Sequence, residues 1–198
     1  MKHLIIYAHP SKKSFSFQLK DALKAESEKR GWSATVRDLY EMKFDPVLWP
    51  SDLEKLKKGE TEEDILSEQA LVKEADIISV VYPLWWAGFP AILKGYIDKI
   101  FAYGFAYKAG KNGIEGLLTN KKVYLYTSMG NTVEEYEEKG LIEAFRKIQG
   151  GEIFEFCGME VKHQEFFPQI PSASTEEIEK HLKVALSVFE PAKQIITN

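Results

Sequence analysis

Three short segments contain residue types that are unusual in ordinary connections, and each directly follows an apolar run typical of a buried strand. They are residues 9–16 (HPSKKSFS), 83–90 (PLWWAGFP) and 127–131 (TSMGN). In open parallel sheets, ligands bind beyond the carboxyl ends of the strands. If the three strands are neighbours in one sheet, the segments converge on a single crevice, and we expect the functional site there.

The segment 9–16 precedes a predicted helix and offers hydroxyl groups at Ser11, Ser14 and Ser16. Hydroxyls, backbone amides and the positive end of a helix dipole together bind phosphate oxygens. Serine is also a preferred helix N-cap, which explains the same residues without a ligand. His9 alone is more typical of a hydrogen-bonded structural histidine. The four histidines show no metal-ligand spacing, so we expect no metal site.

The segment 83–90 places two tryptophans beside a glycine and two prolines. Two indoles in such a loop are unfavourable unless they pack against something flat, and an isoalloxazine ring is flat and largely apolar. The alternative is that the rings fill the core or an oligomer interface, where aromatic side chains are common. We expect a division of roles, with one of Trp85 and Trp86 against the flavin and the other in the core or at an interface.

In the segment 127–131, Gly130 and the nearby amides can approach a flavin edge without a Cβ in the way. An ordinary strand-to-helix turn is the alternative. Several nucleotide-binding and catalytic motifs are absent: GxGxxG after the first strand, GxxxxGK[ST] and GxSxG. The first strand ends in Tyr7-Ala8-His9-Pro10, without the carboxylates of a response-regulator receiver.

Hydrophobic periodicity predicts strands that alternate with helices. The expected strands are 4–8, 32–39, 77–82, 122–126 and 160–166. The expected helices are 17–30, 62–74, 90–101, 132–156 with an interruption at Gly150-Gly151, and a last helix from the capping box of Ser174 and Glu177 to Glu190. The charged stretch 51–63 is expected to be a loop, and 32–39 to lie nearer a sheet edge. This order predicts an α/β fold, a doubly wound five-stranded parallel sheet of order 2-1-3-4-5 with helices on both faces, in one domain over 1–198.

Composition narrows the class of protein. The net charge of −4 argues against nucleic-acid binding, which needs a concentrated basic face. Cys157 is the only cysteine, so there is no internal disulfide or CxxC motif, which suits a reducing compartment. No apolar run approaches the roughly 18 residues of a membrane span, and the first residues lack a signal-peptide pattern. We expect a cytoplasmic protein without membrane insertion.

The residues described above closely resemble the NAD(P)H:quinone oxidoreductase family, that is, DT-diaphorase and its bacterial relatives. The longest match is 83–101 (PLWWAGFPAILKGYIDKIF), followed by 104–107 (GFAY). Shorter matches are Ala8-His9 with Ser14-Phe15, 38–40 (DLY) and 156–158 (FCG). The resemblance spans nearly the whole chain but lacks the C-terminal extension of the animal enzymes.

The resemblance implies a flavodoxin-like fold, a homodimer with a flavin at each interface, and ping-pong hydride transfer from NAD(P)H to quinones or other aromatic acceptors. FAD is the implied cofactor, with FMN as the alternative. The implied cofactor-binding residues are His9, Ser14, Phe15 and Ser16 at the phosphate and ribityl arm, Pro83, Leu84, Trp85, Trp86 and Ala87 around the ring, and Thr127, Ser128, Met129 and Gly130 at its polar edge. Tyr107 is implied to line the substrate pocket, from the same or the partner subunit.

Two departures from the family pattern concern catalysis. Met129 stands where the family has a glycine, so a side chain is expected to crowd that position. The animal enzymes use a tyrosine and a histidine six residues later as a proton relay. Aligning Tyr136 to that tyrosine puts Ile142 in the place of the histidine, and Glu135 is the ungapped match. We therefore expect amides around Gly130 to stabilise developing charge, with Tyr136 as a helper.

A different class of function shares these features. Some short bacterial relatives are flavin-bearing regulatory subunits that sense redox state for a transport system. A plain electron carrier is disfavoured, because a carrier gains nothing from the hydrophobic pocket implied for Trp86, Phe105 and Tyr107. Turnover of NAD(P)H with a quinone separates the enzyme from the regulatory subunit.

Overall fold

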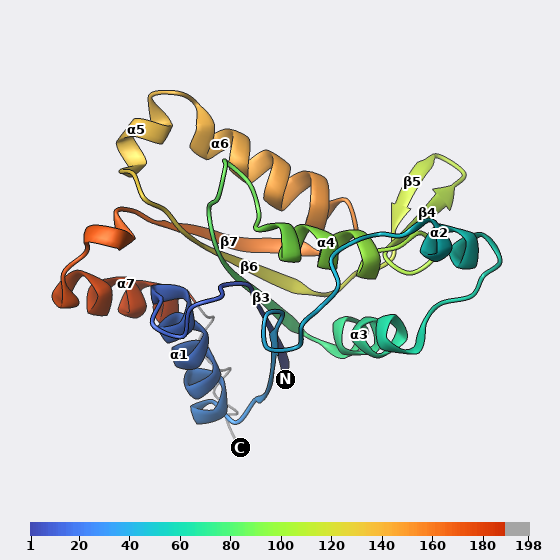
Figure 1. The fold of residues 1–198 in the computed structure, drawn as a ribbon, viewed down its shortest axis with the longest axis horizontal. Helices are drawn as coiled ribbons and strands as arrows, with labels where there is room; N and C mark the ends of the chain where they lie inside the picture. The colour runs from blue at the N-terminus through green and yellow to red at the C-terminus, as the bar shows by residue number, and fades with distance from the viewer. Residues whose placement is uncertain (189–198) are drawn as a thin grey trace, which may run out of the picture.

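Five of the apolar runs form one parallel sheet in the computed structural model, which describes residues 1–188 (Figure 1). The strands are β1 (Lys2–Tyr7), β2 (Ser33–Asp38), β3 (Ile77–Pro83), β6 (Lys122–Ser128) and β7 (Glu160–Phe167). Their order is β2-β1-β3-β6-β7, which confirms the predicted order. Every residue of β3 is buried, whereas β2 lies at an edge and has no fully buried residue.

Helices cover both faces of this sheet, as the alternation of elements predicted (Figure 1). On one face, α1 (Phe15–Lys29) and α7 (Thr175–Ser187) pack over side chains such as Ile5 and Tyr126. On the other face, α3 (Glu63–Glu74) and α4 (Ala91–Ile100) cover Ile78 and Leu125. The capping box of α7 is confirmed, since the Ser174 N–H donates to Glu177 Oε2 at 2.7 Å. The end predicted at Glu190 lies outside the described residues.

The connection from β6 to β7 differs from the single helix that was predicted to break at Gly150-Gly151. It consists of α5 (Val133–Glu137), α6 (Leu141–Phe145) and a π-helix over Arg146–Glu155. The break lies at Gly140, which has φ of 67°. Gly150 lies within the π-helix, where a Cβ would come within 3.4 Å of Gln164 Oε1. This is an ordinary contact distance, so Gly150 lies close against β7 and does not stop the helix.

A helix, a hairpin of two strands and a short 3-10 turn were not predicted. The stretch 51–63, expected to be a loop, begins with α2 (Pro50–Lys57). Pro50 at its first turn and the Asp52 carboxylate, which accepts from the Trp49 N–H at 2.8 Å, explain why a helix starts there. After α4, the chain forms a hairpin of β4 (Tyr107–Gly110) and β5 (Gly113–Gly116). A short 3-10 turn, Ile170–Ser172, links β7 to α7.

Between residues 1 and 188, no helix is both long and apolar enough to cross a membrane.

Candidate functional site

The three segments singled out in the sequence lie together at the carboxyl ends of β1, β3 and β6. The Ala8 N–H donates to the Val81 carbonyl at 3.0 Å, which ties the first segment to β3. The Leu84 N–H donates to the Ser128 carbonyl at 2.8 Å, which ties the second to the third. The strands β1, β3 and β6 are consecutive neighbours in the sheet, so the predicted convergence follows from the topology.

A cavity of about 300 Å³ lies where α1 begins, between this helix and the turn after β7. Its lining side chains are largely hydroxyl-bearing or basic: His9, Ser11, Lys13, Ser14, Phe15, Ser16, Ser128, Ile170 and Pro171. Ser16 Oγ and Ser128 Oγ lie 3.3 Å apart, both on buried side chains. Sequence reasoning missed Ile170 and Pro171, although any turn that follows a strand of this sheet ends at the same edge.

Ser14 has the capping role that was the alternative to phosphate binding. Its Oγ accepts a hydrogen bond from the Phe17 N–H at 3.1 Å, and its backbone is extended. A hydroxyl that accepts in this way keeps its own O–H to donate elsewhere. The start of a 15-residue helix also directs its positive dipole end at the cavity. Capping and anion binding are therefore compatible at this residue.

The segment after β3 forms a tight turn closed by two hydrogen bonds between Trp85 and Gly88, at 3.1 and 3.0 Å. Its central residues, Trp86 and Ala87, have φ of 51° and 58°. A type I′ turn requires positive φ at both positions, and for residues other than glycine this conformation is strained. Backbone strain of this kind is found at ligand clamps.

Neither indole of this turn lies in the core, so of the two places predicted for the second ring, the core is wrong and an oligomer interface stays a prediction. Trp86 is 103% exposed, and Trp85 is 41% exposed with its ring against His9. Pro83 and Leu84, just before the turn, are buried and form its base.

The segment after β6 divides between core and crevice. Thr127 is fully buried on the face opposite to Ser128, and its Oγ1 has no hydrogen-bond partner within residues 1–188. Met129 is 2% exposed and packs in a cluster with Leu84 and Phe166. The expected crowding by Met129 is therefore wrong, because its side chain turns into the core. Its N–H donates to the Phe167 carbonyl at 2.8 Å and is not free for a ligand.

Gly130 is exposed at the rim of the crevice. Its φ is not positive, and no atom of residues 1–188 lies within 4 Å of the place where a Cβ would be. The protein's own packing therefore does not require glycine here. The missing side chain leaves open space beside the Ser128 hydroxyl, through which a flat ligand can approach the backbone.

Tyr136 lies close to this rim but packs against other side chains. Its ring centroid is 5.8 Å from that of Phe145, and it covers the cluster that contains Met129. Glu135, the ungapped match to the family's relay tyrosine, completes a capping box, since its N–H donates to Thr132 Oγ1 at 3.2 Å. Ile142 is buried in the same cluster.

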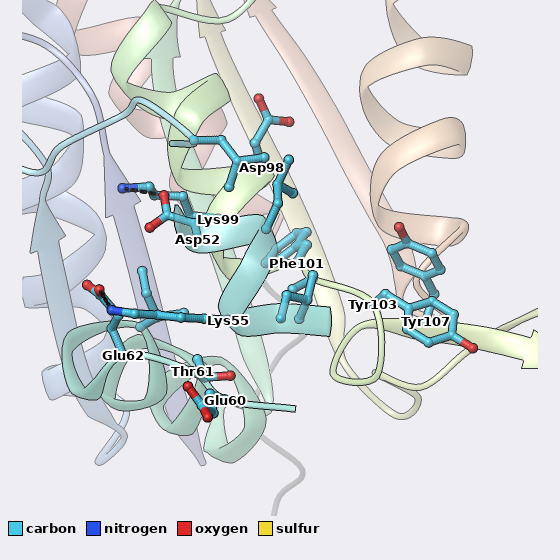
Figure 2. Close-up of a pocket in the computed structure, with 15 residues that line it drawn as sticks. Asp52, Lys55, Glu60, Thr61, Glu62, Asp98, Lys99, Phe101, Tyr103 and Tyr107 are labelled. Atoms are coloured by element: carbon cyan, nitrogen blue, oxygen red, sulfur yellow. Dashed lines mark hydrogen bonds and ion pairs between the residues drawn. The ribbon is translucent and has the colours of Figure 1, made fainter. Parts of the chain in front are cut away.

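Tyr107 does not reach the crevice of its own chain. It begins the β4–β5 hairpin, at the end of the molecule opposite to α5 (Figure 1). Between the Trp85–Gly88 turn and this hairpin runs α4, whose 10 residues span about 15 Å. Tyr107 instead lines a separate cavity of about 190 Å³ between α2, α3 and the end of α4 (Figure 2). Its ring centroid lies 5.8 Å from that of Tyr103 and 5.1 Å from that of Phe156.

The crevice fits a flavin in three respects. Hydroxyls and a helix start surround a cavity of suitable polarity for a phosphate. The ring of Trp86 is fully exposed on a closed turn and available to a flat ligand. Open space at Gly130 lies next to the Ser128 hydroxyl. For metals the residues 1–188 offer no comparable site, since no group of three or more His, Cys, Asp or Glu side chains is placed to hold an ion.

Comparison with known proteins agrees with this geometry. A family model described as flavodoxin-like fold matches residues 1–188. An uncharacterized NAD(P)H oxidoreductase of Haemophilus influenzae is 40% identical over 171 residues, covering 86% of this chain and 85% of the relative. The ribosyldihydronicotinamide dehydrogenase (quinone) of Rattus norvegicus is 35% identical over 203 residues, covering 90% of this chain and 86% of the relative.

Among solved structures, the NAD(P)H:quinone oxidoreductase of Methanothermobacter marburgensis superimposes with a TM-score of 0.83 at 30% identity, covering 94% of each chain. The putative quinone reductase of Klebsiella pneumoniae superimposes with a TM-score of 0.87 at 26% identity, covering 94% of this chain and 83% of the other. Fold, sequence and crevice thus agree: the chain belongs to the family of flavodoxin-like fold, among relatives that include the NAD(P)H dehydrogenases (quinone).

Proposed function

We propose that this protein is an NAD(P)H-dependent flavin oxidoreductase that reduces quinones, and other aromatic acceptors, by two electrons in a ping-pong cycle. The observation that carries the proposal is that three features follow neighbouring strands of one sheet: a hydroxyl-lined cavity at the start of α1, the exposed indole of Trp86 and the open edge at Gly130. A bound flavin, FAD by resemblance or FMN, supplies the chemistry by accepting a hydride and passing it on. The protein supplies binding, orientation and electrostatics.

The first loop and the start of α1 hold the phosphate end of the flavin in this proposal. Ser14 and Ser16 donate hydroxyl hydrogen bonds, with Phe15 buried behind them as part of the wall. Lys13, on the same wall, adds a positive charge. His9 contributes a further donor from the end of β1.

The turn after β3 and the rim after β6 enclose the ring. Trp86 and Ala87 flank one face, and the buried Pro83 and Leu84 keep the turn in place. The hydroxyl of Ser128 and the amide of Gly130 face the polar edge. Because the Met129 amide is already bonded to Phe167, Gly130 is the donor in this segment that we assign to developing negative charge. Pre-oriented donors at such positions contribute roughly 3–4 kcal/mol each in other enzymes.

Tyr107 enters the proposal through a second copy of the chain. Its own crevice is about one α4 length away, whereas its ring is partly exposed beside the exposed rings of Tyr103 and Phe156. A two-fold homodimer that lays this aromatic cluster over the partner's crevice completes the substrate pocket. Light scattering at micromolar concentration is expected to give the dimer mass, and a monomer mass would reject this part.

One set of measurements tests the function. The purified protein is expected to show flavin absorbance, and mass analysis of the released cofactor distinguishes FAD from FMN. Oxidation of NAD(P)H is expected to accelerate strongly on addition of menadione. Bound flavin without such turnover would favour the redox-sensing regulatory subunit. A colourless protein that takes up neither flavin would reject the proposal.

A further inference from the structure

Trp85 packs against His9 across two loops that follow different strands. The ring centroids lie 5.8 Å apart and the ring planes are tilted by 56°. Aromatic pairs at this separation attract one another. Because His9 follows β1 and Trp85 follows β3, the contact joins the phosphate loop to the turn that carries Trp86.

The first loop itself fixes the protonation of His9. The Ser11 N–H donates to His9 Nδ1 at 3.0 Å, so Nδ1 must be unprotonated and a neutral ring carries its proton on Nε2. Burial of the imidazole lowers the pKa of His9, which favours this neutral form. His9 therefore presents Nε2–H as a donor in the wall of the cavity that also contains Ser14 and Ser16.

One hydrogen bond at Nδ1 fixes the tautomer but leaves the ring free to tilt about that bond. The indole of Trp85 restrains this remaining motion from the side. The backbone that carries this indole is fixed, since Trp85 makes both hydrogen bonds that close the turn to Gly88. A ring on a closed turn can hold the neighbouring imidazole in place, whereas a ring on an open loop would move together with the imidazole.

We propose that Trp85 is a positioning residue that acts through His9. In this proposal, which rests on the proposed function, the indole holds the imidazole so that Nε2–H donates to the phosphate or ribityl oxygens of the flavin. Trp85 does not itself bind the flavin ring. Trp86 differs, because its fully exposed ring is available for direct contact.

A double-mutant cycle on flavin affinity separates these roles. Trp85→Ala is expected to weaken binding roughly two- to tenfold, the range of a lost aromatic pair. In a His9→Ala background, Trp85→Ala is expected to cause no further loss, and Trp85→Phe to retain most of the affinity. Trp86→Ala is the matched control, and its effect should add to that of His9→Ala. If the effects of Trp85→Ala and His9→Ala also add, Trp85 contacts the flavin directly and the proposal is wrong.

A second measurement needs no flavin. Nitrogen NMR of the flavin-free protein at about pH 8, above the ordinary imidazole pKa, reports the tautomer of His9. We expect the Nε2–H tautomer in all three proteins, because the Ser11 N–H sets it, but broadened imidazole signals in Trp85→Ala, where the ring is free to tilt, and sharp signals again in Trp85→Phe. Identical imidazole signals in the wild type and Trp85→Ala would overturn the proposal. If the wild type binds no flavin, the proposed function fails, yet this comparison still decides whether Trp85 positions His9.

Discussion

Replacing Ala87 by glycine is expected to stabilise the flavin-free protein. Ala87 is exposed and has φ of 58°, so the substitution removes no packing and relieves a left-handed residue. That conformation costs about 1–2 kcal/mol for a residue other than glycine. Glycine forfeits about 0.5–1 kcal/mol through the greater entropy of the unfolded chain. The net expectation is a gain between about 0 and 1.5 kcal/mol, centred near 0.75 kcal/mol.

Thermal unfolding of the flavin-free protein measures this gain, because bound ligand would add its own stabilisation. For a chain of this size, 1 kcal/mol shifts Tm by roughly 2–4 °C, so Ala87→Gly should raise Tm by about 1–4 °C. The matched control is Ala109→Gly, an exposed alanine in β4 with an ordinary φ. At Ala109 no strain is relieved, so only the greater entropy of the unfolded glycine variant acts, and Tm should fall. Equal decreases in both variants would refute the assignment of strain to the turn.

Four further predictions concern the site and the core. Ser14→Ala together with Ser16→Ala should weaken flavin binding by about 1–3 kcal/mol in a fluorescence titration, and unchanged affinity would reduce this loop to helix capping. Gly130→Ala should leave Tm unchanged, because the new Cβ meets no neighbouring side chain, but should weaken flavin binding. Unchanged flavin affinity would contradict the proposal that the ligand approaches the backbone at Gly130. Tyr136→Phe should slow flavin reduction in stopped-flow experiments by less than about tenfold, or ~1.4 kcal/mol, and a hundredfold loss would make this tyrosine the proton relay. Burial lowers the pKa of His3 to about 3, against about 6.5 in the unfolded chain. On acidification the unfolded state therefore takes up a proton before the folded state does. The free energy of unfolding should fall as the pH drops below 6.5, by up to ~1.4 kcal/mol per pH unit. Proton NMR should show the His3 imidazole neutral at about pH 5 in the folded protein, and a normal titration would refute this.

The main sheet was predictable from the sequence because its signals are local and strong. Apolar runs such as Ile77–Pro83 identify strands buried on both faces, and alternation with helices restricts their order to a few choices. The π-helix was not predictable in this way, since Gly150 and Gly151 are helix breakers by propensity, whereas the structure continues a helix through both. The helix α2 was missed because its sequence is highly charged and it buries no residue.

The candidate site was predictable as a set of segments but not as a set of side chains. Resemblance assigned Thr127, Ser128 and Met129 together to the ligand. Successive residues of a strand face opposite sides, so Thr127 turns to the core while Ser128 faces α1. Resemblance likewise placed Tyr107 in a substrate pocket, but sequence alone could not show that α4 separates it from its own crevice.

The closed turn between Trp85 and Gly88 has a consequence for how such proteins diverge. Its two hydrogen bonds depend only on backbone atoms, and the side chains of Trp86 and Ala87 are exposed. Substitutions at these two positions therefore change what a ligand meets while leaving the sheet and its core unaltered. We expect preference for different acceptors to evolve here first, because substitutions at these positions leave the core packing intact and act on stability only through the local strain of a left-handed residue.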